Sequence, residues 1–177
     1  MSLMIEPTAA RYLEFMIHGF FNGLTTLKQK LLDSENLNDE DLETLYALGY
    51  YLFTYGKYED AKDIFTGLTA YAPYTAYFWR ALGAVNQQVK DYDEAIAAYD
   101  MAIANDPGDV VSYVYRAESK FLSGKKEDGL TDLRNVLEIG ANKPHFSVWV
   151  QRAELLISLQ EPEEVYEEAE EEDLEEV

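Results

Sequence analysis

The side chains best suited to molecular recognition are three aromatic rings spaced at i, i+4 and i+7: Tyr46, Tyr50 and Phe53. On a helix this spacing places all three rings on one face. The opposite face of the same segment carries Leu45 and Leu48, so the segment is apolar nearly all round. A helix that is apolar on two faces needs two packing partners. We therefore interpret the three rings as anchors for a bound ligand.

Catalytic chemistry has little support in the sequence. His18 and His145 are the only histidines, and neither belongs to a spaced metal-binding or nucleophile motif. The chain has no cysteine, so a thiolate metal site and a disulfide framework are excluded. A glycine-rich phosphate loop is also absent from the sequence. We expect a protein that is not an enzyme and that needs no cofactor.

The rings belong to a pattern that recurs every 34 residues. The matching residues of its three copies are Leu45, Leu48, Gly49, Ala61, Phe65, Leu68 and Pro73, then Trp79, Leu82, Gly83, Ala95, Tyr99, Ala102 and Pro107, then Tyr113, Arg116, Ala117, Gly129, Leu133, Val136 and Ala141. This period and pattern are the signature of the tetratricopeptide repeat, in which each unit is a helical hairpin that buries its apolar faces against its neighbours. The sequence predicts an all-α helical solenoid.

The repeat also predicts the organisation of the chain. Gly49 and Gly83 permit a close approach of the two helices of a hairpin, and Pro73 and Pro107 end the second helix of the first two repeats. Asn38 is a plausible N-cap of the first repeat helix. The expected parts are an N-terminal helical segment at 1–37, repeats at about 42–75, 76–109 and 110–143, a capping helix at 144–160 and an acidic tail at 161–177.

In this repeat, the side chains at five positions of each first helix face the concave side of the stack. The candidate peptide-binding residues at these positions are Tyr46, Tyr50, Phe53, Tyr77, Arg80, Ala84, Gln87, Val114 and Phe121. Arg80 and Gln87 could hydrogen-bond the backbone of a ligand among apolar anchors. Two other interpretations stay open: the N-terminal helical segment covers the rings, or the rings are ordinary repeat packing.

The charge of the chain is concentrated in its last residues. Eleven of the 34 acidic residues lie within 161–177, and they account for more than half of the net charge of −20. We expect a disordered, solubilising tail, with a site for a basic partner as the alternative. The acidic balance disfavours nucleic-acid binding. The sequence has no membrane-spanning apolar run and no secretory signal, so we expect a cytoplasmic protein.

Four stretches carry a more specific resemblance: 42–50 (LETLYALGY), 56–61 (GKYEDA), 82–84 (LGA) and 92–96 (YDEAI). With them the chain resembles the class II chaperones of bacterial type III secretion systems over about residues 8–160. The resemblance implies a protein that keeps a hydrophobic translocator soluble in the cytoplasm and binds an extended Pro-x-Leu-x-x-Pro segment in the concave groove. It also implies a homodimer formed through the N-terminal helices.

Other tetratricopeptide functions serve as alternatives. A co-chaperone that grips a C-terminal carboxylate needs a clamp of Lys, Asn and Arg side chains in the groove. The clamp positions of this chain hold Tyr46, Tyr50, Ala84 and Val111, so the clamp is missing. A generic interaction scaffold, or an assembly subunit whose groove is filled by another copy, is the remaining alternative.

Overall fold

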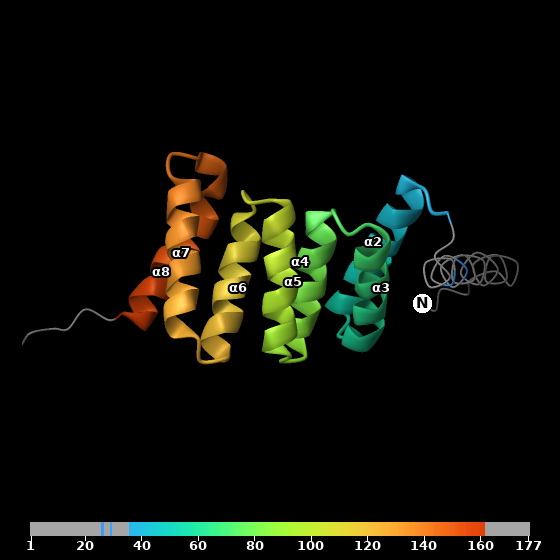
Figure 1. Ribbon diagram of the computed structural model, residues 1–177, viewed down its shortest axis with the longest axis horizontal. Coiled ribbons are helices and arrows are strands. Elements are labelled where there is room, and N and C mark those ends of the chain that lie inside the picture. The colour runs from blue at the N-terminus through green and yellow to red at the C-terminus, as the bar shows by residue number, and fades with distance from the viewer. Residues whose placement is uncertain (1–25, 27–28, 30–35, 162–177) are drawn as a thin grey trace, which may run out of the picture.

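The computed structural model describes residues 26, 29 and 36–161, and these ranges contain helices and no strand, in agreement with the predicted all-α fold. The elements are, in chain order, α2 (Asp39–Thr54), α3 (Tyr58–Tyr71), α4 (Ala76–Gln88), α5 (Tyr92–Asn105), α6 (Val110–Leu122), α7 (Lys126–Gly140), the single 3-10 turn η1 (Pro144–Phe146) and α8 (Ser147–Gln160). Figure 1 shows these helices standing side by side in a row, with α2 near one end and α8 at the other.

Consecutive helices pair into hairpins, as the 34-residue period predicts. α2 packs on α3, α4 on α5 and α6 on α7, and each hairpin also packs on the next. The first helices contact one another from hairpin to hairpin, α2 with α4, α4 with α6 and α6 with α8, whereas successive second helices hardly meet. The first helices therefore line the inner side of a curved stack, and α8 continues their row as the helix that closes it.

The start of α2 is fixed by its own side chains. The Oδ1 atom of Asn38 accepts a hydrogen bond from the backbone N–H of Asp41 at 2.9 Å, and an Asp41 carboxylate oxygen accepts one from the backbone N–H of Asn38 at 3.2 Å. This reciprocal pair is a capping box, and it satisfies two donors that a helix start would otherwise leave without partners. The prediction that Asn38 caps the first repeat helix is confirmed.

A glycine on the first helix allows the hairpins to close. A Cβ atom added to Gly83 would lie 2.6 Å from the ring of Tyr99, a residue of α5 that is fully buried. The third hairpin reverses the arrangement, because Gly129 of α7 receives the ring of Phe121 from α6. In both hairpins, an aromatic ring fills the space that a missing side chain leaves.

The tight turns inside the hairpins have one backbone conformation. Gly56, Lys90 and Gly124 follow one another at 34-residue intervals and have φ angles of 73°, 66° and 80°. This left-handed region costs a side-chain-bearing residue about 1–2 kcal/mol. Lys90 therefore bears a strain that Gly56 and Gly124 avoid.

The first two hairpins share an apolar core. Leu45 of α2, Phe65 of α3, and Phe78 and Val85 of α4 are almost completely buried, and other apolar side chains of both hairpins pack around them. Burial of each such side chain contributes about 1.5–3 kcal/mol. These contacts hold α2 and α4 side by side and so fix the inner surface on which the candidate residues lie.

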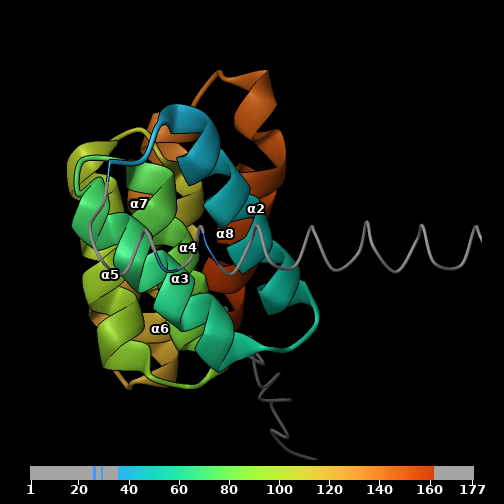
Figure 2. The same ribbon diagram turned by 90° about the vertical axis from the view of Figure 1, so that its right-hand side faces the viewer.

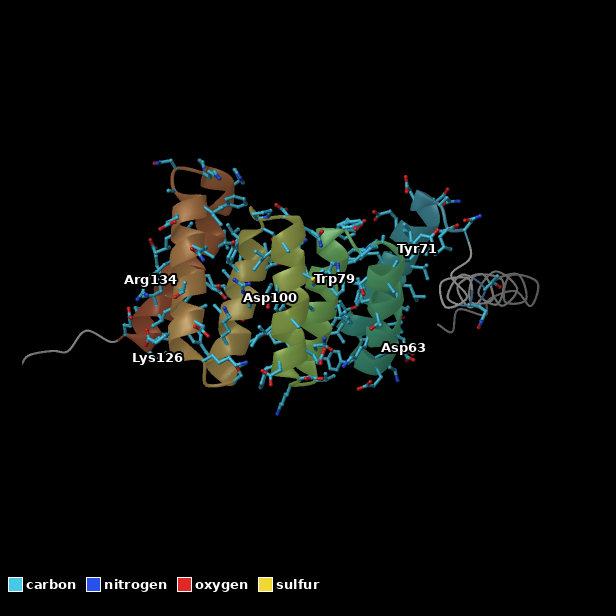
Figure 3. All side chains as sticks on the ribbon, viewed as in Figure 1. Asp63, Tyr71, Trp79, Asp100, Lys126 and Arg134 are labelled. Carbon is cyan, nitrogen blue, oxygen red and sulfur yellow. The ribbon has the colours of Figure 1, made fainter. Side chains whose placement is uncertain are left out.

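The third hairpin combines apolar packing with a network of ion pairs. Arg116 takes the position held by Leu48 and Leu82 in the other repeats, and its guanidinium binds Asp132 of α7, which is nearly inaccessible to solvent. Arg116 also binds Asp100 of α5 at 2.6 Å; Asp100 is labelled in Figure 3. Lys120 donates at 2.8 Å to the Oδ2 atom of Asp132, which also accepts from the Nε atom of Arg116. A charged cluster thus replaces the leucine contact of the first two hairpins.

Two of the predicted parts lie almost wholly outside the described residues. These are the N-terminal helical segment, expected at 1–37, and the acidic tail, expected at 161–177. Among the described residues, no helix combines the length and the apolar character that crossing a membrane requires.

Candidate peptide-binding groove

The ring of Tyr46 lies at the junction of the first two hairpins. Its centroid lies 5.8 Å from that of Phe65 on α3, 5.1 Å from that of Tyr77 and 5.9 Å from that of Phe78 on α4. Edge-to-face and tilted contacts of this kind stabilise aromatic clusters beyond simple area burial. The first two hairpins therefore use part of the Tyr46 ring for their own packing, which for this ring agrees with the alternative of ordinary repeat packing.

Tyr50 and Phe53 differ in how much of each ring is available. Tyr50 is 58% exposed, whereas Phe53 is partly buried and its ring packs on that of Tyr58 with a centroid separation of 5.7 Å. Of the three rings on this face of α2, Tyr50 is the one that a ligand could cover most extensively. Tyr46 and Phe53 form walls on either side of it, one turn away along the helix.

Tyr77 extends the aromatic surface onto α4 and is held in place by a carboxylate. Its hydroxyl donates a hydrogen bond of 2.7 Å to Glu43 of α2. Burial and the hydrogen bond to Glu43 raise the pKa of Tyr77 to about 12. The hydroxyl therefore keeps its proton at neutral pH, and the bond to Glu43 fixes the ring beside Tyr46.

The guanidinium of Arg80 is anchored across the inner surface. Its Nη1 atom lies 2.9 Å from both carboxylate oxygens of Asp109, a nearly buried residue that also caps the N-terminus of α6 by accepting from the N–H of Val111 at 3.2 Å. About a third of the Arg80 side chain stays exposed. The hydrogen bond to Asp109 fixes the direction of Arg80, and only the remaining N–H groups could serve a ligand.

The other candidates on α4 are smaller or already engaged. Ala84 is partly exposed and occupies the position equivalent to Tyr50, so a methyl group stands at this point of the groove where α2 has a ring. The Oε1 atom of Gln87 accepts a hydrogen bond of 3.1 Å from the hydroxyl of Tyr99, which leaves its amide N–H groups as donors for a ligand.

The two candidates of the third repeat differ in their exposure. Val114 is completely buried with Leu133 and Val136 of α7 and Ala153 of α8, so its inclusion in the site is wrong. Phe121 is partly buried, with one side of its ring against Gly129, as Phe53 is partly buried two repeats earlier, so its role in the site stays a prediction. A short valine side chain at this position is covered by the next helix, whereas the longer Tyr46 reaches past its neighbours.

Sequence reasoning missed two surfaces. Tyr51 and Tyr55 of α2 are 53% and 69% exposed, and their ring centroids lie 4.5 Å apart. The other surface is on α8, where Val148 and Leu155 are exposed. Each surface lies on a helix at one end of the stack. The repeat register identifies these two end helices from the sequence, and apolar side chains on an end helix have fewer neighbours to cover them.

Comparison with known proteins identifies the same repeat and a set of related bacterial proteins. Residues 46–110 match the family model "Tetratricopeptide repeat". The chain is 28% identical over 141 residues to low calcium response locus protein H of Yersinia pseudotuberculosis, covering 80% of this chain and 82% of that protein. The corresponding protein of Yersinia pestis is 27% identical over the same length.

Solved structures agree with this relationship. The type III secretion translocator chaperone SycD of Yersinia enterocolitica has a TM-score of 0.68, is 28% identical and matches over 71% of this chain and 87% of its own. SycD in complex with a peptide of the translocator YopD has a TM-score of 0.67, 29% identity and coverage of 70% and 95%.

PcrH, a protein of Pseudomonas aeruginosa, is similar in the same way. Its complex with the chaperone-binding region of PopD has a TM-score of 0.69, 25% identity and coverage of 71% of this chain and 95% of its own. These matches confirm the resemblance predicted from the sequence. The chain is therefore a homologue of low calcium response locus protein H and has the tetratricopeptide-repeat fold of the type III secretion translocator chaperones SycD and PcrH.

Proposed function

We propose that this protein is a chaperone that keeps a hydrophobic translocator of a type III secretion system soluble by binding an extended segment of it in the groove lined by α2, α4 and α6. One observation carries the proposal: Tyr50 is 58% exposed on the inner surface, between partly buried aromatic walls. An exposed aromatic anchor of this kind is typical of interface hot spots. The homologous SycD and PcrH are described in complexes with YopD and PopD segments, which supports the same ligand class here.

The groove suits a ligand that must later be released. Two or three apolar anchors contribute about 1.5–3 kcal/mol each, and ordering an extended chain offsets part of that gain, so the expected affinity is micromolar in scale. A proline-containing segment is already extended and loses less entropy on binding. This role needs binding and no catalysis, and we propose that it is performed in the cytoplasm.

The end of the stack at α2 supports a role for the N-terminal segment in this function. Tyr51 is half exposed, whereas Val85, Ser119 and Ala153, which follow it at 34-residue intervals, are almost completely buried on helices that each pack on a preceding hairpin. Figure 2 views the molecule from this end, with α2 and α3 nearest the viewer. We propose that residues 8–32, of this chain or of a second copy in a homodimer, cover Tyr51 and Tyr55.

A titration tests the proposed function. Wild-type protein is titrated with the peptide Pro-Ala-Leu-Ala-Ala-Pro and with a scrambled peptide of the same composition, and the heat of binding is measured. We expect micromolar affinity for the first peptide and no measurable binding of the second. Equal binding of both peptides would contradict recognition of the extended motif.

A further inference from the structure

The outward face of α8 has the composition of a cap. Ser147, Gln151, Glu154 and Ser158 lie along the face where another second helix would pack, and all four are exposed. A terminal helix of a repeat stack needs a polar outer face of this kind to stay soluble. The outer face of α8 therefore shows no sign of a further hairpin or of end-to-end stacking.

A second stripe of α8 is apolar and equally exposed, which a cap does not require. Val148, Leu155 and Leu159 are 70%, 59% and 65% exposed, and Arg152 lies among them on the same face. Single exposed apolar residues are common, but a row of three on one helix face marks an interaction surface.

The repeat register shows which surface this stripe continues. Val148, Arg152 and Leu155 lie three repeat periods after Tyr46, Tyr50 and Phe53, so the two sets occupy the same positions of the first and the last helix of the row.

Two hydrogen-bonded pairs connect the row. Tyr77 binds Glu43 and Arg152 binds Glu118, each across a separation of 34 residues between neighbouring first helices. The stripe therefore lies on the inner surface, at the opposite end from Tyr50.

We propose that α8 provides a second apolar anchoring site for the cargo, occupied by a continuation of the same extended segment that binds at Tyr50. This inference rests on the proposed function. Helices in contact lie about 8–10 Å apart, so the three steps from α2 to α8 cover about 24–30 Å. An extended chain spans that distance with about eight residues. A six-residue motif seated at α2 falls short of α8, and a longer segment reaches it.

The surface between the two anchoring sites can accommodate an extended backbone. Ala84 offers little obstruction, and Glu118 forms a hydrogen bond of 2.9 Å with the Nε atom of Arg152, whose guanidinium also stacks 5.4 Å from the ring centroid of Tyr115. These groups are small or already paired. At these points the middle of the groove offers little apolar area, so apolar anchoring is left to the two ends.

Two other occupants of the stripe are less compatible with the structure. A second copy stacked end to end would meet the polar outer face of α8 rather than the stripe. Glu161, the last described residue, forms an ion pair of 3.0 Å with Arg134 of α7, which Figure 3 labels, and so is held toward α7 rather than toward the stripe. Continuity with the groove thus favours the cargo itself.

The experiment compares a short probe with long ones. The short probe is Pro-Ala-Leu-Ala-Ala-Pro, and the long probes add twelve residues with alternating leucines to its N- or C-terminal side. Two reciprocal variants of the full chain are used: Leu155→Gln, which removes an apolar side chain from the stripe, and Gln151→Leu, which adds one to the outer face. Both positions are exposed, so unfolding temperatures close to wild type are expected and are measured first.

We expect wild-type protein to bind one long probe more tightly than the short one. Leu155→Gln should weaken that long probe about three- to tenfold and leave the short probe unchanged, while Gln151→Leu changes neither. Unchanged affinity of Leu155→Gln for the long probe overturns the second site. If wild-type protein binds neither the short nor the long probes, the proposed function is overturned as well.

Two further measurements assign the stripe if another occupant covers it. A fall in mass by light scattering on Leu155→Gln would assign it to a second copy. A gain in long-probe affinity on removal of residues 162–177 would assign it to the tail.

Discussion

Replacement of Tyr50 by alanine tests whether the groove binds through this ring. A tyrosine side chain has about 200 Å² of surface to bury, and 58% of the residue is exposed, so about 115 Å² is available to a ligand. At about 25 cal/mol per Å², complete coverage would contribute about 3 kcal/mol, and coverage of half the area about 1.5 kcal/mol. We therefore expect Tyr50→Ala to weaken the binding of Pro-Ala-Leu-Ala-Ala-Pro about tenfold or more.

The same structure predicts a small effect on folding. Because Tyr50 is largely outside the core, Tyr50→Ala should reduce the free energy of unfolding by less than about 1 kcal/mol. Leu48→Ala, which removes a side chain packed against the core of the first two hairpins, should cost more. Denaturant unfolding of both variants distinguishes the binding role of Tyr50 from a structural one.

Tyr74→Ala is the matched control for binding, because Tyr74 is 87% exposed and lies outside the helices in the turn after α3. Titration calorimetry with the same peptide is run on wild type and on both tyrosine variants. Equal affinity of all three proteins would refute the assignment of the site to Tyr50. Equal weakening in both variants would refute its specificity.

Three further predictions concern stability and assembly. Asp132→Ala removes the shared partner of Arg116 and Lys120 and should destabilise the protein by about 3–5 kcal/mol, measured by denaturant unfolding, whereas loss of less than about 1 kcal/mol would contradict a cohesive network. Lys90→Gly relieves the left-handed backbone and should raise stability by up to about 1 kcal/mol; a lower unfolding temperature would argue against strain at this turn. Removal of residues 1–35 should take away the proposed cover of Tyr51 and Tyr55 and change the oligomeric state measured by light scattering, and an unchanged oligomeric state with folded repeats would exclude self-association through this segment.

The repeat period predicted the hairpins because small residues, large apolar residues and prolines recur at fixed positions. Gly83 and Pro73 carry this information locally, so the sequence alone indicates where helices approach each other and where they end. The exposure of individual candidates depends on what packs over them. Tyr50 stays exposed and Val114 does not, although the repeat assigns both to the inner surface, because α7 and α8 enclose the shorter side chain.

The partners of the polar candidates lie further along the chain and could not be predicted. Arg80 pairs with Asp109, 29 residues later, and nothing in the repeat pattern marks that aspartate as its partner. Tyr51 illustrates the converse case. Its exposure could have been predicted, because the later first helices each pack on a preceding hairpin, and none precedes α2 among the described elements.

The network around Asp132 gives the two halves of the stack different mechanical character. Apolar contacts are non-directional and weaken gradually as surfaces slide, whereas hydrogen-bonded ion pairs weaken steeply with small changes in distance and angle. Each hairpin contacts mainly its neighbours, so strain applied at one end passes along the row step by step. The contacts between the first two hairpins should therefore weaken gradually as the hairpins are displaced. The hairpin of α6 and α7 is held by the ion pairs of Arg116 and Lys120 with Asp132. It should resist small displacements and then separate abruptly once these bonds break.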